Sequence, residues 1–258
     1  MNKQELIQYL DVYLKISEFK DSSKNGLQVD TEKTEIKKIG YAVDASTYIF
    51  DKAISENVDM VLSHHGLYWG YEETMTGVWF ERATQLIKND IWLYAAHLPL
   101  DVHEEVWNNI WLIKAFVRIF WLREEDYQIE SFADHKWKNI WFWVKFKNKL
   151  HISNLVIPYA ETMWLIKRLF NFGNIQYFTS FAVVSWSAAK HFKDAKEAWY
   201  EVFLTGEANH AQMVMLKEYK QTVLIGWHYE TEKIGPKLLA YHLRNKFGIE
   251  IVFLDEKY

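Results

Sequence analysis

Hydrophobic and polar residues change periodicity along the chain in the way expected when strands and helices alternate. We expect a first series of strands at 37–43, 58–62 and 91–96, with helices at 3–14, 46–56, 78–89 and 105–118. A second series follows, with strands at 180–184, 200–204, 221–226 and 249–254 and helices at 187–198, 208–218 and 231–246. Between them, residues 122–178 are less regular, with a Lys-rich strand at 139–147 and a helix near 153–169. This alternation predicts an α/β fold with a largely parallel sheet covered by helices.

The two regular series match each other in order, which indicates a duplication. In both, a first strand leads into a helix, a second strand ends in polar residues, and a third is followed by His-x-x-x-acid. We therefore expect two repeats that interlock. Residues 1–125 form the first, which carries His64, His65 and Asp101, and residues 126–258 form the second, which carries Glu207, His228 and Glu232.

These six ionisable residues all follow predicted strands, where ligands collect in α/β sheets. Imidazole and carboxylate ligands without thiolate suit zinc, manganese or non-haem iron. These candidate ligands are more numerous than one tetrahedral ion needs. They therefore predict two divalent ions (Fe, Zn or Mn) that share a bridging water. Glu207, His97 and His210 are candidates for orienting the ligands or for transferring protons.

Each candidate also has a purely structural interpretation. His64 and His65 are adjacent, so they reach one site only if the strand has already ended there. His228 and Glu232 could be a surface pair on a first helical turn, and Asp101 could cap the helix predicted at 105. Glu207 and His210 could serve only to cap a helix, and His97 and His103 could be ordinary polar residues.

Composition narrows the possible functions. The chain has 258 residues and no cysteine, which excludes disulfides, thiolate metal sites and a cysteine nucleophile. A formal net charge of −4 provides no field that would attract nucleic acid or an anionic membrane. The first residues lack the pattern of a signal peptide, and no uncharged apolar run is long enough to span a bilayer. We therefore expect a cytoplasmic protein.

One segment favours a different function. Residues 135–150 interleave five lysines with five aromatic residues, a pattern typical of single-stranded nucleic-acid binding. The alternative is an edge strand whose lysines protect it from pairing with another chain. The acidic net charge makes nucleic acid the less favoured partner.

Tryptophan is abundant and glycine is scarce. The chain has 13 tryptophans and 10 glycines, and many tryptophans stand where a turn would suit glycine. Trp121 is at the predicted end of a helix, and Trp186 lies between a strand and a helix. Counting every tryptophan except Trp69 as glycine would give 22 glycines, an ordinary share. We hypothesise that UGA codons read as glycine in the source were translated as tryptophan. The alternative is a genuinely Trp-rich protein.

Several motifs together resemble the NIF-three-like dinuclear-metal-centre family, whose members are also labelled GTP cyclohydrolase type 2 homologues. They are NGLQV at 25–29, VDAS at 43–46, SHHGLYW at 63–69, AAHLPLD at 95–101, NNI at 108–110, TGE at 205–207 and HYETE at 228–232. The resemblance implies two intertwined α/β structural repeats with a mixed sheet in each, and a homohexamer. It also implies two metal ions held by His64, His65, Asp101, His228 and Glu232.

The sequence departs from the family pattern mainly at tryptophans. Those standing where the family commonly has glycine are Trp107, Trp111, Trp137, Trp141, Trp164, Trp186 and Trp227. The function we expect is a metal-dependent hydrolase acting on a small nucleotide-like or cyclic amide substrate. The alternative is a non-catalytic metal carrier or a metal-stabilised scaffold.

Overall fold

The computed structural model describes residues 1–71, 74–103, 105–106, 108–135, 138–156, 168–197 and 199–256. The chain folds into two compact units, which we call unit 1 (Met1–Trp107 with Lys233–Tyr258) and unit 2 (Asn108–Glu232). The sequence interpretation divided the chain once, after residue 125. In the structure the chain passes from unit 1 to unit 2 after Trp107 and returns to unit 1 at Lys233. There, strand β11 (Glu250–Phe253) pairs in parallel with β2 (Lys38–Ala42).

Unit 1 is built around a five-stranded sheet in the order β1-β4-β3-β2-β11, in which only β1 is antiparallel to its neighbour. Its remaining strands are β1 (Gly26–Val29), β3 (Met60–Ser63) and β4 (Trp92–Ala95). Its helices are α1 (Lys3–Tyr13), η1 (Ile16–Glu18), α2 (Thr47–Ser55), α3 (Gly77–Lys88), α4 (Leu98–Asp101) and α9 (Ile234–Phe247). Asn2 caps the first helix, since its side chain accepts from the backbone N–H groups of Gln4 and Glu5.

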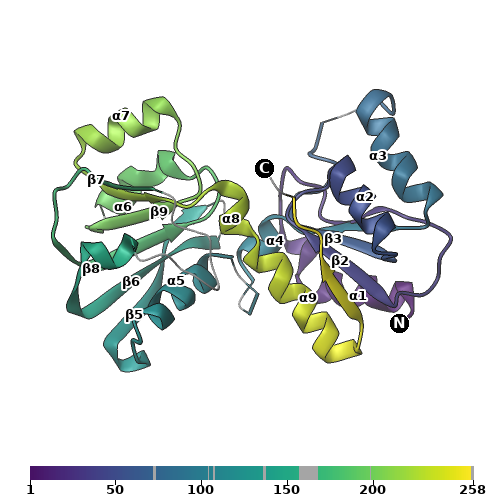
Figure 1. The fold of residues 1–258 in the computed structure, drawn as a ribbon, viewed down its shortest axis with the longest axis horizontal. Coiled ribbons are helices and arrows are strands. Elements are labelled where there is room, and N and C mark those ends of the chain that lie inside the picture. Colours follow the sequence, from purple (N-terminus) through teal and green to yellow (C-terminus); the bar gives the residue numbers. More distant parts are fainter. Residues whose placement is uncertain are drawn as a thin grey trace. The chain divides into compact units, whose positions relative to one another are not determined.

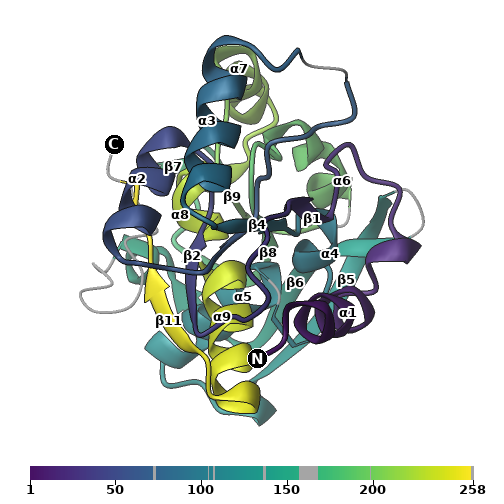
Figure 2. The same ribbon diagram turned by 90° about the vertical axis from the view of Figure 1, so that its right-hand side faces the viewer.

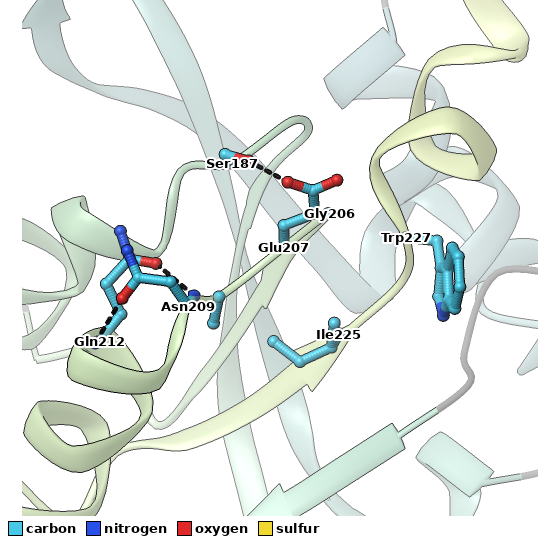
Figure 3. A pocket seen from close by; sticks show the side chains of 8 residues that line it. Ser187, Gly206, Glu207, Asn209, Gln212, Ile225 and Trp227 are labelled. Carbon is cyan, nitrogen blue, oxygen red and sulfur yellow. Dashed lines mark hydrogen bonds between the residues drawn. The ribbon is translucent and has the colours of Figure 1, made fainter.

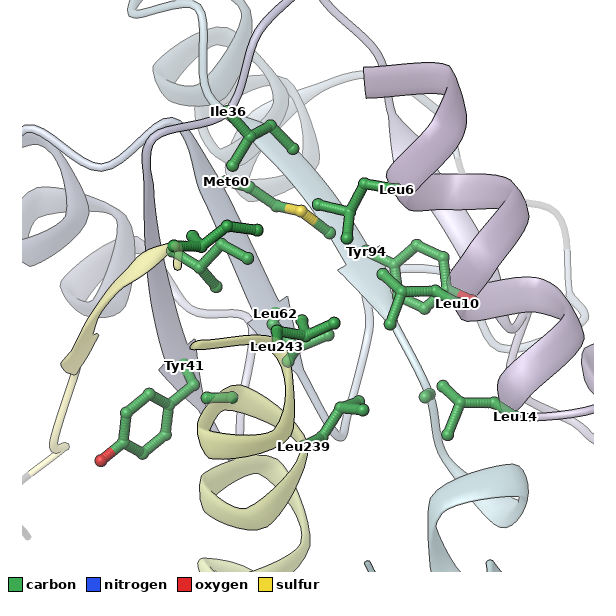
Figure 4. Close-up of a cluster of buried hydrophobic side chains, with 14 of the residues drawn as sticks. Leu6, Leu10, Leu14, Ile36, Tyr41, Met60, Leu62, Tyr94, Leu239 and Leu243 are labelled. Carbon is green, nitrogen blue, oxygen red and sulfur yellow. The ribbon is translucent and has the colours of Figure 1, made fainter. Parts of the chain in front are cut away.

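Helices cover both faces of this sheet (Figure 2). On one face, Leu10 of α1 and Leu243 of α9 pack against Tyr94 and other buried strand residues (Figure 4). On the opposite face, Phe50 of α2 and Leu86 of α3 pack in a second apolar cluster. Burial of these apolar faces is the main contribution that holds the helices on the sheet.

Unit 2 has a six-stranded sheet in the order β5-β6-β8-β9-β10-β7 (Figure 1). Its strands are β5 (Tyr127–His135), β6 (Lys138–His151), β7 (Arg168–Asn171), β8 (Tyr177–Val184), β9 (Val202–Thr205) and β10 (Thr222–Ile225). Its helices are α5 (Asn108–Ile119), η2 (Glu124–Asp126), η3 (Ile152–Val156), η4 (Ala189–His191), α6 (Phe192–Glu197), α7 (His210–Glu218) and α8 (His228–Glu232). Phe116 of α5 packs its ring against Phe146, Phe178 and Phe181 of the sheet.

The two sheets share a core of four strands and differ at the other edge, where β11 is parallel to β2 but β6 is antiparallel to β8. This confirms the expected α/β architecture with two helix-covered mixed sheets. Strands β2, β3 and β4 run parallel in unit 1, and β8, β9 and β10 run parallel in unit 2. In each unit a short antiparallel strand, β1 or β7, pairs with the last of the three. Sequence periodicity predicted neither of these strands, because each is only partly buried and mixes polar with apolar residues instead of forming a continuous apolar run.

The Lys-rich segment does not form an edge strand, contrary to one expectation. Strand β6 pairs with β5 on one side and with β8 on the other. Phe142, Trp143 and Phe146 of this strand are buried, so these rings offer no stacking surface to a nucleic acid. The helix predicted near 153–169 falls largely on residues outside the described part of the chain. Its described ends are the short helix η3 and strand β7. Among the described residues, no helix is long and apolar enough to cross a membrane.

Four tryptophans adopt the left-handed backbone conformation that favours glycine. They are Trp121 (φ 53°), Trp186 (φ 56°), Trp199 (φ 65°) and Trp227 (φ 73°). A bulky residue in this conformation is strained, so the backbone supports the glycine interpretation at these four positions. Trp107, Trp137, Trp164 and the side chain of Trp141 lie outside the described part of the chain.

Two of these tryptophans end helices in the way glycine usually does. Trp121 donates its backbone N–H to Arg118 O, and the next residue donates to Val117 O, which forms a Schellman motif after α5. Trp199 closes α6 with the same pair of bonds. Their side chains are 91% and 88% exposed, so packing of the indoles does not offset the strain.

Candidate metal centre

His64 and His65 directly follow the end of β3 in unit 1. Ladder pairing of β3 with β4 ends at Ser63. The two histidines then donate backbone N–H groups to Ala42 O and Val43 O. The strand has thus ended before His64, which is the condition for both histidines to reach one site. One ligand atom of each of His64, His65 and His97 lies within 4.8 Å of the others. Unit 1 therefore brings three imidazoles together.

His64 and Asp101 form a completely buried pair. His64 donates Nδ1–H to Ala96 O at 3.0 Å, which orients the ring and makes Nε2 the nitrogen suited to a metal. His64 Nε2 lies 3.8 Å from Asp101 Oδ2, and neither side chain is exposed. Asp101 is the last residue of α4, whereas α5 begins at Asn108, so Asp101 does not cap a helix near 105.

His65 is oriented by a carboxylate that sequence analysis did not single out as a functional residue. Its Nδ1–H donates to Asp44 Oδ1 at 2.7 Å. Because this bond holds the Nδ1 tautomer, Nε2 becomes the ligand atom. Asp44 follows β2 and is 21 residues from His65 in the chain, so only the pairing of β2 with β3 brings them together.

His97 is held by Asp21 of the loop before β1, whose side chain is only 2% exposed. His97 Nδ1–H donates to Asp21 Oδ2 at 3.0 Å, and the same oxygen accepts from Leu98 N and the Asn25 amide. Burial alone would raise the pKa of Asp21, but the His97 side chain and these N–H donors hold it well below its usual range. The Asp21–His97 contact joins residues 76 apart, and no local pattern indicates it.

In unit 2, the candidate residues lie at the carboxyl ends of β9 and β10. His228 and Glu232 are the first and last residues of α8, and His228 Nε2 lies 3.1 Å from Glu232 Oε2. Glu207 Oε1 lies 3.5 Å from His228 Nδ1. Both imidazole nitrogens of His228 thus face carboxylates. The Glu232 side chain is only 1% exposed, which does not fit a surface ion pair.

The surroundings of Glu207, His210 and His103 differ from those of the buried ligands. Glu207 accepts a hydrogen bond from the Ser187 hydroxyl and is not the cap of α7. The cap is Asn209, which forms a capping box with Gln212. His210 is the first residue of α7 and is exposed. His103 donates Nε2–H to Tyr13 O, so in unit 1 it anchors a loop.

The donors in each unit fit divalent metals. Unit 1 places imidazoles beside the buried Asp101 carboxylate, and unit 2 places an imidazole beside the buried Glu232 carboxylate. Burying a carboxylate is costly unless a cation or hydrogen bonds compensate it. Groups of imidazole and carboxylate with no thiolate suit zinc, manganese or iron.

Comparison with known proteins gives consistent matches over the whole length. The family model described as Duf34/NIF3 (NGG1p interacting factor 3) matches residues 1–258. A Pyrococcus abyssi protein named GTP cyclohydrolase 1 type 2 homolog is 34% identical over 256 residues, covering 99% of this chain and 98% of that protein. A protein of the same name from Archaeoglobus fulgidus is 36% identical over 255 residues, with the same coverage.

Solved structures match equally well. TTHA1606 from Thermus thermophilus has a TM-score of 0.83 and 34% identity, covering 100% of this chain and 99% of that one. Reduced HcgD from Methanocaldococcus jannaschii has a TM-score of 0.81 and 25% identity, with coverage of 99% and 98%.

Proposed function

Because the chain belongs to the DUF34/NIF3 family, we propose that it is a metal-dependent hydrolase with a dinuclear centre held by His64, His65, Asp101, His228 and Glu232. The observation that carries this proposal is the pair of imidazole–carboxylate contacts made by buried carboxylates, His64–Asp101 and His228–Glu232. The proposal requires both groups to serve the same pair of ions. Two divalent ions bound there would supply Lewis-acid activation of water near neutral pH.

The protein's own residues prepare this chemistry. Asp44 and Ala96 O hold the rings of His65 and His64 in the tautomer that leaves Nε2 as ligand. We propose that Glu207 accepts or donates a proton during hydrolysis; its contacts with the Ser187 hydroxyl and with His228 support this role. His97 and His210 are the further candidates for proton transfer.

The substrate we propose is a small nucleotide-like or cyclic amide molecule. The names of the curated relatives, GTP cyclohydrolase 1 type 2 homolog, support this class. The chain is also proposed to assemble as a homohexamer. Phe80 and Ile87 are exposed on one face of α3 and support self-association, and light scattering on the purified protein would measure the mass.

Elemental analysis of protein purified without added metal tests the centre. We expect about two ions per chain, and iron, zinc or manganese as their identity. Replacing His228 or Glu232 by Ala should lower bound metal sharply, whereas Glu207→Ala should leave most of it. Glu218→Ala is the matched control, since it removes an exposed carboxylate at the opposite end of α7 from Glu207. Undiminished metal in the first two variants would overturn the ligand assignment.

Turnover assays separate the hydrolase from a metal carrier. Phosphoesters, cyclic amides and GTP would be tested with and without chelator. Turnover that depends on metal supports the hydrolase. Tight stoichiometric metal with no turnover would instead support the carrier or scaffold, because the ions would then serve only binding or assembly.

A further inference from the structure

Three histidines of unit 1 are each oriented by a hydrogen bond from the same ring nitrogen. His64 donates its Nδ1–H to a backbone carbonyl. His65 donates its Nδ1–H to the Asp44 carboxylate. His97 donates its Nδ1–H to the Asp21 carboxylate. In all three rings Nε2 is therefore the nitrogen suited to a metal, although the proposed function uses only the first two as ligands.

The three rings are spaced as rings around a single ion are. Their centres lie 4.7 Å apart for His64 and His65, 5.1 Å for His64 and His97, and 5.6 Å for His65 and His97. A zinc-bound imidazole has its ring centre about 3.2 Å from the ion, so two such rings at a tetrahedral angle have centres about 5.2 Å apart. One ring nitrogen of each histidine also lies within 4.8 Å of the other two.

Neighbouring side chains hold this arrangement and favour a cation. The Trp69 indole packs against the rings of His65 and His97, with ring centres 5.6 Å and 5.0 Å away. The same indole donates its Nε1–H to a backbone carbonyl, so it restricts the movement of both rings. The completely buried Asp101 places Oδ2 3.8 Å from His64 Nε2. A cation among the imidazoles would offset the cost of burying this carboxylate.

Unit 2 offers different groups at the carboxyl ends of its strands. There, Glu207 is bonded to the Ser187 hydroxyl, and the pocket beside α7 that both line also contains the carboxamides of Asn209 and Gln212 (Figure 3). Imidazole suits zinc, iron and nickel, whereas neutral oxygen ligands suit magnesium and calcium. The imidazole-rich group is therefore a feature of unit 1.

We propose that His64, His65 and His97 form a three-imidazole site that binds one divalent transition-metal ion within unit 1. Three protein ligands that leave a fourth position open are typical of catalytic zinc sites. The site gives His97 the role of a metal ligand, and it needs no ligand from unit 2. The inference deepens the proposed function and rests on it for the ligand roles of His64 and His65.

Binding of Co²⁺ to the full-length chain tests the proposal. The double variant His228→Ala/Glu232→Ala lacks the proposed ligands of unit 2. We expect it to keep about one Co²⁺ per chain by elemental analysis, with the intense visible absorption of four-coordinate cobalt. Adding His97→Ala should weaken Co²⁺ binding by about 100-fold or more, because losing a ligand costs at least as much as losing the group that orients it.

Two further variants separate ligand loss from damage to the fold. His97→Gln keeps an N–H donor for Asp21 but removes the imidazole, so it should weaken Co²⁺ binding as much as His97→Ala does. The matched control is His151→Ala, which removes an exposed imidazole of β6 and should leave binding unchanged. Each is added to the double variant, and circular dichroism verifies that all variants retain their secondary structure.

Three results would overturn the three-imidazole site. The first is a double variant that binds no Co²⁺. The second is Co²⁺ binding that survives both substitutions of His97. The third is an equal loss of binding in His151→Ala.

The outcomes also separate this inference from the dinuclear centre. Two ions in the unaltered chain and none in the double variant would keep the dinuclear centre and remove the three-imidazole site. One ion in the unaltered chain and in the double variant, lost with His97→Ala, would keep the three-imidazole site and remove the dinuclear centre.

Discussion

The two units are built alike at the amino ends of their parallel strands and differently at the carboxyl ends. Asp59 precedes β3 and accepts from the backbone N–H groups of Lys37 and Lys38, at the start of β2. Glu201 precedes β9 and accepts in the same way from the N–H groups of Thr179 and Ser180 in β8. The two carboxylates hold equivalent places in the ladders.

At the carboxyl ends, unit 1 positions its histidines by side-chain hydrogen bonds, whereas unit 2 has residues in the left-handed backbone conformation. In unit 1, Asp44 orients His65 and Asp21 orients His97. In unit 2, Trp186 and Trp227 have left-handed backbone conformations near Gly206. A Cβ at position 206 would lie 2.7 Å from Trp186 O and 2.9 Å from His228 Cα, so only glycine fits there.

This contrast indicates what a duplicated α/β repeat retains. The amino ends contribute only stability, so the same carboxylate contact serves in both units. The carboxyl ends carry the polar loops, where sequence can change without disturbing the buried sheet. They have therefore diverged into a histidine-rich group in unit 1 and, in unit 2, a group built around Gly206 and the left-handed turns at Trp186 and Trp227.

The strongest test of this contrast is to replace Trp121, Trp186, Trp199 and Trp227 together by glycine. Each left-handed tryptophan is strained by about 1–3 kcal/mol, so the free energy of unfolding of the quadruple variant should rise by several kcal/mol. Thermal unfolding should shift upward by more than about 5 °C. Soluble yield should rise with it.

Trp69→Gly is the control for that experiment. The Trp69 indole donates to Gly66 O at 3.0 Å, and its φ is not positive, so glycine there should lower the melting temperature. An unchanged melting temperature in the quadruple variant would contradict the strain argument. UGG codons at the tryptophan positions in the gene would end the codon hypothesis.

A second test concerns the side chains that orient ligands in unit 1. Asp44→Asn removes the charge that holds His65 Nδ1–H, so metal affinity should fall by about 10–100-fold while the fold is retained. Competition with a chromophoric chelator measures this affinity. Asp30→Asn, which changes an exposed aspartate paired with Lys3, should leave it unaltered. Equal affinity in both variants would show that Asp44 does not orient a ligand.

The smallest effect is expected at the shared amino-end contact. Asp59→Asn and Glu201→Gln should each lower the free energy of unfolding at pH 7 by about 1–3 kcal/mol, because charged acceptors of backbone N–H groups are lost. Urea unfolding measures both. Similar losses of stability would support the equivalence of the Asp59 and Glu201 contacts, and a loss in one unit alone would contradict it.

The Asp59 contact should also depend on pH. Burial alone would raise the pKa of Asp59, but Lys33 and two backbone N–H groups bring it below its usual value. A carboxyl whose pKa is lower in the folded chain stabilises the fold fully at pH values above its pKa in the unfolded chain, about 4. This stabilisation is lost as the pH falls through the pKa of the folded chain. The difference between Asp59→Asn and the unaltered chain should therefore be full at pH 7 and shrink below about pH 4. A constant difference would contradict this assignment.

Much of the fold could be predicted because it depends on local pattern. Buried strands such as β3 and β9 are continuous apolar runs, and the helix starts at Asn2 and Ser46 have polar caps. Strands β1 and β7 escaped prediction, because they are only partly buried and their polar residues interrupt the apolar run that reveals β3 and β9. The two His-x-x-x-acid motifs do not superpose residue for residue. His97 immediately precedes α4, whereas His228 is the first residue of α8, a difference of one position.

By itself, the sequence determined the α/β class, the duplicated order of elements, the histidines and carboxylates available as ligands, and the absence of thiolate chemistry. These depend on residue type and on spacing along the chain. Only the tertiary structure decided that α9 and β11 return to unit 1, that Asp44 and Asp21 orient histidines, and that tryptophans occupy left-handed turns. These features depend on hydrogen bonds and packing between residues far apart in sequence, or on backbone angles, which no local pattern encodes.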